Sequence, residues 1–481
     1  MDLVPQKRVG SKGAARRFDV VVLGGGAGGL VAAREARRRG ATVALVHDGE
    51  PGGDCTFTGC VPSKALISAA ARGASFIAAM TAVRSAVERI AATENAATLR
   101  GEGIEVLDGW GRFTSRRTLV VDNTVVRSKR FIVATGSRPA IPEIPGFADL
   151  SPLTNETIFD LERSPDHLVV VGGGAIGCEL AQAFARLGTA VTLIESGERL
   201  LAREEPETSA VVTSALRADG VTVHTSTDVV SAQLLADGVA RLHVGSAEVI
   251  DADRVLVATG RVPAVDGFGL EELGVVLGDA RAIVVDDTMA TNVGGVWAIG
   301  DVTGQFQFTH AAARMGWVAV ANATSRTSRL RPARFDPTAM PWVTFTSPEV
   351  GRVGLTEDEA ARRYASARVA VLPMTLVDRA VTVGDTAGFV KLIAAPRHLV
   401  GHLGGGRLVG ATVVAPTGGE LIHEAALAMQ TNMFLGRLAQ TTHAYPTWSM
   451  AIQQAALQFF GESSGLRARA IRARSTDGDG Q

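Results

Sequence analysis

The sequence predicts an α/β fold in which one strand–turn–helix–strand unit occurs twice. The segment VVLGGGAGGLVAAREARRRGATVALVHDGE, which begins at Val21, superposes without a gap on VVVGGGAIGCELAQAFARLGTAVTLIESGE, which begins at Val169. In each copy an apolar run suited to a buried parallel strand precedes the glycines, and a helix with one apolar face and a second β-branched run follow them. A chain of 481 residues is also too long for one compact core, so several domains are expected.

Both copies carry the pattern G-x-G-x-x-G at the strand-to-helix turn, which in this frame is a dinucleotide-binding fingerprint. The first glycine makes the turn, the second lets the backbone approach a pyrophosphate, and the third lets the helix pack on the strand. The helix N-terminus then faces the phosphate charge. Two Rossmann-like dinucleotide-binding domains are therefore predicted, with these glycines: Gly24, Gly26 and Gly29, then Gly172, Gly174 and Gly177.

Two further segments repeat and are expected to close each nucleotide domain over its ligand. FIVATGSRP contains Thr135 and Gly136, and VLVATGRVP contains Gly260, each after a candidate strand. A third segment, TNVGGVWAIGDVTG, ends a strand-like stretch at Gly300 and Asp301. Two interpretations of Asp301 remain open, an acceptor of hydrogen bonds from a polyol chain or an ordinary turn residue.

The residue that closes the second strand of such a unit usually contacts the adenosine ribose. In the second copy it is Glu195, whose carboxylate accepts from a 2′-hydroxyl and repels a 2′-phosphate, so NADH is preferred. Arg199 lies four residues on and leaves NADPH open. In the first copy the matching residue is His47, followed by Asp48; either Asp48 takes the role after a one-residue shift, or His47 serves as a neutral donor.

Composition limits the class of protein. Hydrophobic residues make up 46% and charged residues 20%, with a net charge of -1, which indicates a globular protein without nucleic acid as an expected partner. We find no uncharged apolar run of about 18 residues, so no membrane span is predicted. The first seventeen residues are basic without an apolar segment, which does not fit a secretory signal. Three cysteines cannot build a disulfide framework, so a cytoplasmic location is expected.

Cys55 and Cys60 lie close together in PGGDCTFTGCVPSK, directly after the first unit. Pro62 and Ser63 suit a helix start, and the field of a helix N-terminus lowers the pKa of a nearby thiol. This arrangement favours a redox pair. Zinc is the competing interpretation, but no second Cys or Cys/His pair completes four ligands, so no metal is predicted. Cys178, on the second glycine-motif helix, is expected to be a small buried residue.

Together with the closing HAYPT, these motifs resemble the FAD-dependent pyridine nucleotide–disulfide oxidoreductases (class I), which include lipoamide dehydrogenase, glutathione reductase and mercuric reductase. The resemblance covers roughly Phe18 to Gly461. It implies an enzyme with FAD and NAD(P)H as cofactors, which works as a homodimer whose active site takes residues from the partner's C-terminal segment. It also implies these domains: FAD-binding, 18–150 and 281–331; NAD(P)H-binding, 151–280; α+β dimerisation, 332–461; flexible tails, 1–17 and 462–481.

The resemblance also implies residue roles. Gly24, Gly26 and Gly29 would hold the FAD pyrophosphate and Asp301 the ribityl side, while Gly172, Gly174, Gly177 and Glu195 would hold the nicotinamide nucleotide. Cys55 would be the outer, interchange thiol and Cys60 the thiolate against the flavin. Lys64 and Glu179 would form an ion pair near the flavin edge. Electrons would pass from NAD(P)H through FAD to a Cys55–Cys60 disulfide.

The chain departs from this family near its C-terminal end. Lipoamide dehydrogenase and glutathione reductase carry a His and, five residues on, a Glu as acid–base pair; here Tyr445 and Met450 stand there. His443 is expected to share a face with Tyr445 on an extended segment and is a candidate base. A tyrosine there resembles mercuric reductase. That enzyme also carries a vicinal Cys pair near its C-terminus, whereas this chain has no Cys after Cys178.

The small-molecule electron acceptor therefore stays open between a quinone, a small disulfide and a soft metal ion. The alternatives are a true lipoamide dehydrogenase, a true mercuric reductase, and a flavin-binding subunit that only scaffolds a complex.

Overall fold

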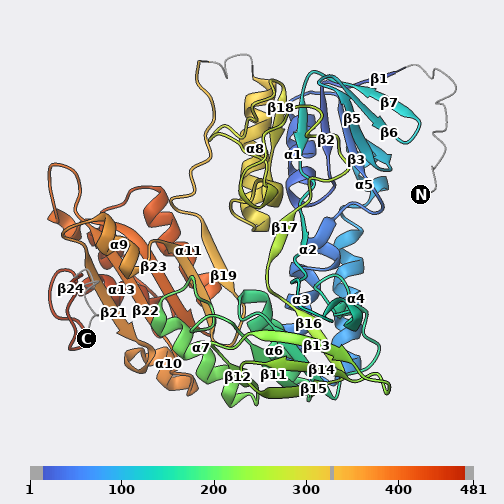
Figure 1. Ribbon diagram of the computed structural model, residues 1–481. Helices are drawn as coiled ribbons and strands as arrows, with labels where there is room; N and C mark the ends of the chain where they lie inside the picture. The colour runs from blue at the N-terminus through green and yellow to red at the C-terminus, as the bar shows by residue number, and fades with distance from the viewer. Residues whose placement is uncertain (1–14, 326–329, 472–481) are drawn as a thin grey trace, which may run out of the picture.

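The computed structural model describes residues 15–325 and 330–471. Its three units are built around two parallel sheets and one large antiparallel sheet, and smaller sheets pack beside them (Figure 1). The first parallel sheet has five strands in the order β18-β8-β2-β3-β4, and all its neighbours are parallel. The strands are β2 (Val20–Leu23), β3 (Val43–His47), β4 (Ile104–Asp108), β8 (Phe131–Val133) and β18 (Val296–Ala298). Strand β18 comes from the segment after the second nucleotide unit and completes the sheet of the first.

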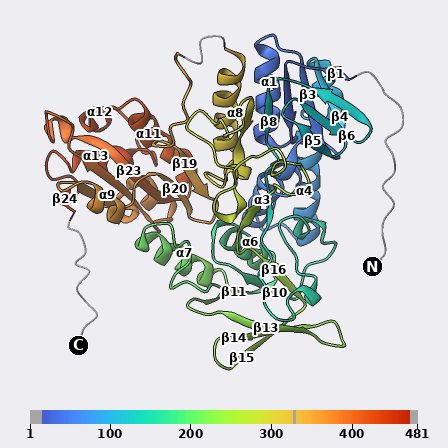
Figure 2. The same ribbon diagram turned by 45° about the horizontal axis from the view of Figure 1, so that its top comes forward.

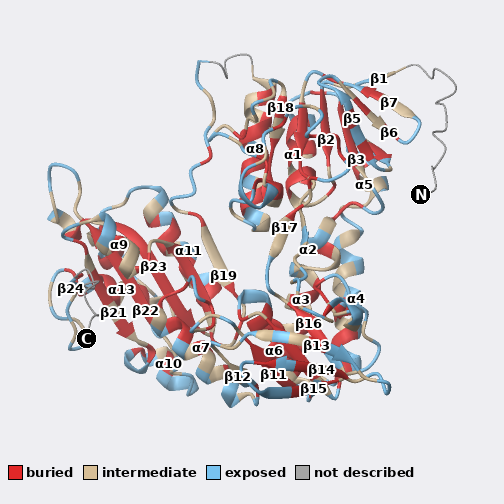
Figure 3. Cartoon of the chain, in the orientation of Figure 1, coloured by how far each residue is buried: buried red, intermediate tan, exposed pale blue. Residues whose placement is uncertain are grey.

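Alternate residues of β2 face opposite layers, as the period of two in a strand requires. Val20 and Val22 pack with helices α1 (Ala27–Arg38) and α8 (Thr309–Thr324). Val21 and Leu23 pack against a smaller sheet of order β1-β7-β6-β5. Its strands are β1 (Arg16–Arg17), β5 (Gly111–Ser115), β6 (Thr118–Val121) and β7 (Thr124–Arg127). Both faces are covered, so β2 is fully buried (Figure 3).

The second parallel sheet has the order β12-β11-β10-β16. Helices α6 and α7 belong to this unit, and a three-stranded antiparallel sheet, β13-β14-β15, packs on one face of the parallel sheet, where Leu242 shares a core with Val169 and Val171 (Figure 2). The bounds are β10 (His167–Val171), α6 (Ala175–Arg186), β11 (Ala190–Ile194), α7 (Pro206–Ala218), β12 (Thr222–His224), β13 (Val229–Leu234), β14 (Ala240–Val244), β15 (Glu248–Ala252) and β16 (Arg254–Val257). The two glycine turns are alike: Gly24 N donates to Val46 O and Gly172 N to Ile194 O, both at 2.8 Å.

Helices α3 (Cys60–Ala71) and α4 (Phe76–Ala91) follow the first unit in the chain but pack against the second. Leu66 and Met80 share a core with Cys178 and Phe184 of α6. A two-stranded ribbon, β9 (Ser137–Pro139) with β17 (Arg261–Pro263), pairs the segments that follow the two Ala-Thr-Gly turns. The cysteine segment therefore lies where the two nucleotide units meet.

The third unit is a six-stranded antiparallel sheet of order β19-β20-β23-β22-β21-β24 (orange to red in Figure 1). Its elements are β19 (Pro341–Thr344), β20 (Glu349–Gly354), α9 (Glu357–Arg363), β21 (Arg368–Pro373), α10 (Asp378–Val383), β22 (Phe389–Ala395), β23 (Arg407–Ala415), α11 (Gly418–Gln430), α12 (Leu435–Gln440), α13 (Met450–Leu457) and β24 (Arg469–Ala470). Helices α11 and α13 contribute Ile422, Ala425, Ile452 and Ala455 to its core.

The remaining short elements lie in the connections. They are α2 (Gly53–Phe57), α5 (Ala96–Gly101), η1 (Ala148–Leu150), η2 (Ile158–Asp160), η3 (Asp279–Arg281), η4 (Gly300–Thr303), η5 (Met374–Leu376) and η6 (Leu403–Gly405). Among the described helices, none combines the length and the apolar character needed to cross a bilayer.

The flexible tails predicted for 1–17 and 462–481 are corrected where the structure describes them. Strand β1 pairs in parallel with β7, and β24 pairs with β21. Arg469 bonds Glu357 at 2.6 Å and Ile471 is buried, so backbone pairing and apolar burial order these segments. Residues 1–14 and 472–481 lie outside the described ranges.

Candidate active site

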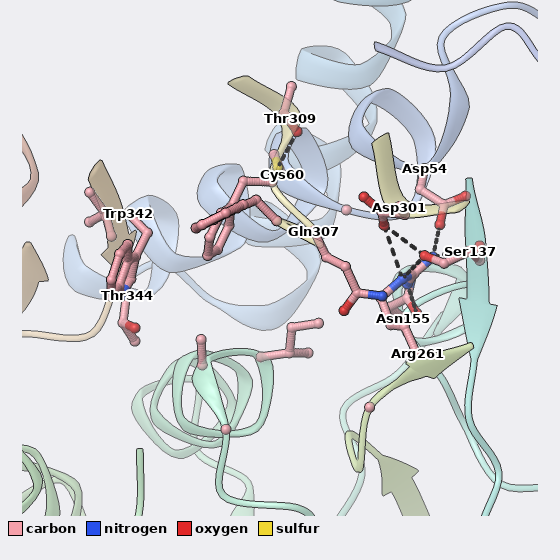
Figure 4. A pocket seen from close by; sticks show the side chains of 18 of the residues that line it. Asp54, Cys60, Ser137, Asn155, Arg261, Asp301, Gln307, Thr309, Trp342 and Thr344 are labelled. Atoms are coloured by element: carbon pink, nitrogen blue, oxygen red, sulfur yellow. Dashed lines mark hydrogen bonds and ion pairs between the residues drawn. The ribbon is translucent and has the colours of Figure 1, made fainter. Parts of the chain in front are cut away.

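A cavity of about 1640 Å³ runs along both nucleotide units and reaches the third unit. Figure 4 views part of it, with Cys60 and Thr309 on one side and a cluster around Arg261 on the other. It is lined by the glycine turns of both units, the cysteine pair, the residues after both Ala-Thr-Gly turns, and aromatic side chains of the third unit. Sites far apart in the sequence thus open into one space.

The cysteines lie on two consecutive helices, Cys55 within α2 and Cys60 as the first residue of α3. The helix therefore begins earlier than the predicted start at Pro62 and Ser63. Ser63 N and Oγ both bond Gly59 O, at 3.1 and 2.7 Å, which closes the first turn. Pro62 fits within this turn because the first N–H groups of a helix need no intrahelical partner.

Two glycines bring this loop against the first nucleotide turn and close it on itself. A Cβ on Gly53 would lie 2.6 Å from Gly26 Cα, and one on Gly59 would lie 2.7 Å from Asp54 O. Real Cβ atoms do not approach so closely, so both positions require glycine. The cysteine loop is thereby packed directly on the G-x-G-x-x-G turn.

The two thiols have opposite electrostatic surroundings. The pKa of Cys60 is lowered to about 6, chiefly by a hydrogen bond with Cys55, helped by Thr309 and by the charge of Lys64 against the effect of burial. Cys60 Sγ lies 3.5 Å from Thr309 Oγ1. The same Cys55–Cys60 bond and burial raise the pKa of Cys55. At neutral pH the pair therefore holds a thiolate on Cys60 and a thiol on Cys55. Cys178 is fully buried, as predicted.

An ion pair joins the cysteine helix to the second glycine-motif helix. Lys64 Nζ lies 2.7 Å from Glu179 Oε2, and the Glu179 side chain is only 5% exposed. Glu179 Oε1 accepts a hydrogen bond from Phe345 N at 2.8 Å. Lys64 Nζ also lies 4.6 Å from the centroid of the Phe345 ring. One buried carboxylate thus ties α3, α6 and the start of the third unit together.

Glu195 and His47 occupy matching places at the ends of the second strands. Glu195 Oε2 accepts from Gly173 N at 2.6 Å and Oε1 accepts from Gly197 N at 2.7 Å. His47 Nδ1 accepts from Gly25 N at 3.1 Å, and its Nε2 donates to Glu50 O at 2.8 Å. These two bonds assign the neutral imidazole with its proton on Nε2.

Of the two interpretations, the structure favours His47 over Asp48 at this place. Asp48 is exposed and is not among the residues that line the cavity, whereas His47 is. Strand β3 keeps its register to His47, so no one-residue shift occurs. Toward its own glycine turn His47 is an acceptor through Nδ1, and its Nε2 proton goes to Glu50 O.

Arg199 is engaged within its own loop. Its guanidinium donates to Glu204 O at 2.8 Å, to Ser209 Oγ at 2.9 Å and to Ala202 O at 2.7 Å. These bonds occupy the side chain of Arg199, which was the reason for keeping NADPH as an alternative nucleotide. The carboxylate of Glu195 is then the acidic group at the end of the strand.

The Ala-Thr-Gly turns and Asp301 meet at the opposite side of the cavity. Gly136 and Gly260 line it, and Thr135 Oγ1 donates to Ala264 O at 2.7 Å. Asp301 Oδ2 accepts from Ser137 Oγ at 2.7 Å, and burial raises the pKa of this carboxyl. Its place on the cavity wall favours the ligand-facing interpretation over the turn residue.

The glycine turns leave the room that a dinucleotide needs. A Cβ on Gly26 would meet only Gly53 Cα at 3.9 Å, and one on Gly174 would meet nothing within 4 Å. Both glycines line the cavity at a helix N-terminus, so a side chain there would fill space that suits pyrophosphate oxygens. Both turns therefore fit a dinucleotide.

His443 and Tyr445 point to different surroundings, so the expectation of a shared face is wrong. The His443 side chain is 7% exposed, with Nε2 3.1 Å from Glu424 Oε1 of α11. Tyr445 is 69% exposed, and a hydrogen bond to Asp378 raises its pKa. Neither residue is among those that line the cavity of this chain's own cysteine pair.

Two sequence profiles match the chain. Residues 18–316 match "Pyridine nucleotide-disulphide oxidoreductase", and residues 340–456 match the dimerisation domain of the same proteins. The chain belongs to the pyridine nucleotide–disulfide oxidoreductase family. Members are flavin-dependent enzymes that use FAD and NAD(P)H, and the dimerisation-domain match supports a homodimer.

Relatives with different activities are equally similar. A mercuric reductase from Streptomyces lividans is 35% identical over 93% of this chain and 98% of its own. A dihydrolipoyl dehydrogenase from Thermus scotoductus is also 35% identical, over 92% of this chain and 97% of its own. Identity within the family therefore leaves the acceptor undecided.

Solved structures share the whole architecture. LpdA from Mycobacterium tuberculosis has a TM-score of 0.82 at 27% identity and covers 92% of this chain and 99% of its own. The Cu(II) complex of RclA, an HOCl-induced flavoprotein disulfide reductase from Escherichia coli, has a TM-score of 0.84 at 25% identity, with the same coverages of 92% and 99%. The predicted fold class, two nucleotide-binding units with a C-terminal dimerisation domain, is confirmed.

Several residues at the cavity had no signal that identified them in the sequence. Thr309 begins α8 and reaches Cys60 across the first unit. Arg261 stands where the first Ala-Thr-Gly segment has Ser137, and this one difference between two otherwise similar segments was the available hint. Trp342 Nε1 donates to Glu204 Oε1 at 2.7 Å at the boundary of the third unit.

Proposed function

We propose that this family member is an NAD(P)H-dependent reductase that carries a Cys55–Cys60 redox disulfide and passes electrons to a quinone-type acceptor or a soft metal ion. The observation that carries the proposal is the split of the two thiols, with the pKa of Cys60 lowered to about 6 and that of Cys55 raised. Such a pair is suited to reversible thiol–disulfide chemistry at neutral pH.

The cofactors are assigned to the two glycine turns. Gly24, Gly26 and Gly29 with Asp301 would hold FAD, and Gly172, Gly174, Gly177 and Glu195 would hold the nicotinamide nucleotide, with NADH preferred. Bound FAD would accept a hydride from NAD(P)H and supply the electron pair that opens the disulfide. Thr135, Gly136 and Gly260 would close the two turns over these ligands.

The protein side chains determine which of the two sulfurs takes up the one proton of this reaction. Two electrons break the S–S bond; Cys55 takes up a proton and becomes a thiol, while Cys60 remains a thiolate. Thr309 and Lys64 both favour the thiolate of Cys60. Glu179 holds Lys64 in place at 2.7 Å, so the ion pair keeps a positive charge near the sulfur.

The acceptor is inferred from the C-terminal segment. A disulfide substrate needs a base and a proton donor beside the outer thiol. His443 is bonded at both ring nitrogens, to Thr441 O and to Glu424, and Tyr445 is an exposed phenol. In the proposed homodimer this segment would come from the partner subunit, and it brings no free imidazole. Quinones and soft metal ions need none.

True lipoamide dehydrogenase and mercuric reductase remain the alternatives. The engaged His443 counts against the first, and the lack of a Cys after Cys178 counts against the second. Within the described residues no cluster of three His, Cys, Asp or Glu suits a metal ion. We expect the enzyme to act in a reducing cytoplasm, since three cysteines are too few to build a disulfide framework.

Anaerobic titration of the FAD-loaded protein with NADH tests the proposal. Two-electron reduction should produce long-wavelength absorbance from the Cys60 thiolate beside the flavin. Cys60→Ser should remove this band, Cys55→Ser should show it without reductant, and Cys178→Ala should behave as wild type. A flavin that NADH does not bleach would favour a scaffold, and bleaching without the band, with both thiols reactive as isolated, would refute the disulfide.

A further inference from the structure

Arg261, the first residue of β17, bonds three separate segments of the chain (Figure 4). Its Nε donates to Ser137 Oγ at 2.7 Å, its Nη2 to Ser137 O at 2.9 Å, and its Nη1 to Asn155 Oδ1 at 3.0 Å. Nη2 also forms an ion pair with the carboxylate of Asp54, the neighbour of Cys55. The guanidinium therefore donates from all three nitrogens of its planar fork.

Asn155 connects Arg261 to the other end of the loop between Cys55 and Cys60. It is 8% exposed, and its Nδ2 donates to Thr58 O at 3.2 Å. Arg261 thus holds the loop directly at Asp54, before Cys55, and through Asn155 at Thr58, before Cys60. Between these two points the loop is held by Thr56, whose Oγ1 donates to Glu94 Oε2 at 2.8 Å.

The Arg261–Asp54 contact joins two oppositely charged groups, unlike the bonds to Ser137 and Asn155. The Arg261 side chain is 15% exposed and that of Asp54 46%. Asp301 Oδ2 lies 3.8 Å from Arg261 Nε, so the guanidinium sits between two carboxylates. A disulfide forms only when the two Cβ atoms come within roughly 3.5–4.5 Å, so the position of this loop decides how readily the cysteines close.

We propose that Arg261 is a positioning residue that holds the Cys55 loop against Cys60 and thereby sets the stability of the Cys55–Cys60 disulfide. The proposal rests on the proposed function, since it needs that disulfide to form. Arg261 touches neither sulfur; it acts through Asp54 and through Asn155.

The test is the equilibrium of the FAD-loaded protein with dithiothreitol. The protein S–S bond breaks to give two cysteine thiols, and dithiothreitol loses two hydrogens and closes its own ring disulfide. Alkylation after quenching counts the reduced fraction and yields the effective concentration of the pair. Arg261→Gln and Asp54→Asn should each lower it about tenfold, as expected for groups that act through one interaction.

The double variant should be no worse than Arg261→Gln alone, because Arg261→Gln already removes the contact with Asp54. Arg261→Lys should fall between Arg261→Gln and wild type, since an ammonium keeps the charge but not the fork. Arg138→Gln is the matched control: this arginine lies on the paired strand β9, bonds exposed Asp266, and should stay within about twofold of wild type.

The outcomes separate the two proposals. If wild type forms no disulfide that dithiothreitol reduces, the proposed function fails. If wild type forms it and Arg261→Gln and Asp54→Asn both lie within twofold of wild type, only the role of Arg261 fails. Additive losses in the double variant also overturn it. If Arg261→Gln does not fold, Asp54→Asn decides alone, with unchanged melting temperature and FAD content as the condition for a valid reading.

Discussion

His443 and Glu424 form an ion pair in which Nε2 lies 3.1 Å from Oε1, while His443 Nδ1 lies 2.9 Å from Thr441 O. Both ring nitrogens lie within hydrogen-bond distance of oxygen acceptors of the same chain, so the imidazole is already engaged on both sides. The only imidazole of the C-terminal HAYPT segment is therefore tied to α11.

The first prediction concerns the acceptor. General acid–base catalysis contributes about 10²–10⁴-fold, so kcat/KM for lipoamide and glutathione disulfide should lie at least about 100-fold below that for a good quinone. The measurement is steady-state kcat/KM with a panel of quinones and disulfides, in wild type, His443→Ala and Glu424→Gln. Both variants should leave the ratio between the acceptor classes unchanged. Efficient lipoamide turnover that His443→Ala abolishes would show His443 to be the base after all.

The second prediction concerns pH. The pKa of Cys60 is lowered to about 6 and that of Cys55 is raised, so the reduced pair binds one proton above pH 6 and a second one below it. The midpoint potential of the pair should therefore fall by about 30 mV per pH unit above pH 6 and by about 59 mV per unit below it. Anaerobic redox titration between pH 5 and 8 measures the break. A single slope of 59 mV throughout would mean that Cys60 is protonated at neutral pH.

The third prediction concerns the nicotinamide nucleotide. The Glu195 carboxylate accepts from Gly173 N at the strand end, and Arg199 already donates to carbonyls of its own loop, so NADH should be the better reductant. Glu195→Gln should raise the kcat/KM ratio of NADPH to NADH about tenfold, a difference of ~1.4 kcal/mol. Glu198→Gln, an exposed acid outside the cavity lining, is the control and should leave the ratio unchanged. Equal efficiency of both nucleotides in wild type would contradict the assignment.

The fourth prediction concerns His47 and FAD. Loss of the bond from Gly25 N to His47 Nδ1 should loosen the first glycine turn, so His47→Ala should raise the FAD dissociation constant about tenfold. His47→Glu should bind FAD nearly as wild type, because a carboxylate accepts from the glycine N–H as Glu195 does in the second unit. Fluorescence titration of FAD into the apoprotein measures the constants. Asp48→Asn is the control; weaker FAD binding in that variant, with His47→Ala unchanged, would restore the role to Asp48.

The sequence by itself determined the parts of this protein that depend on local chemistry. The two G-x-G-x-x-G turns, the pair Cys55 and Cys60, and the strand-ending Glu195 are recognisable because each occurs in a short segment with its strand or helix beside it. The gapless repeat predicted two nucleotide units of the same design, and the structure gives both turns the same 2.8 Å hydrogen bond.

Only the tertiary structure decided which distant side chains meet. Arg261 and Asp54 are 207 residues apart, Lys64 and Glu179 are 115 apart, and Cys60 and Thr309 are 249 apart. It also decided that His47, and not Asp48, lies at the strand end beside the glycine turn. His443 turns toward Glu424 and does not share an exposed face with Tyr445. Residue spacing specifies periodicity within one helix or strand, but the contact between two elements follows from how their apolar faces pack, and no single segment contains that information.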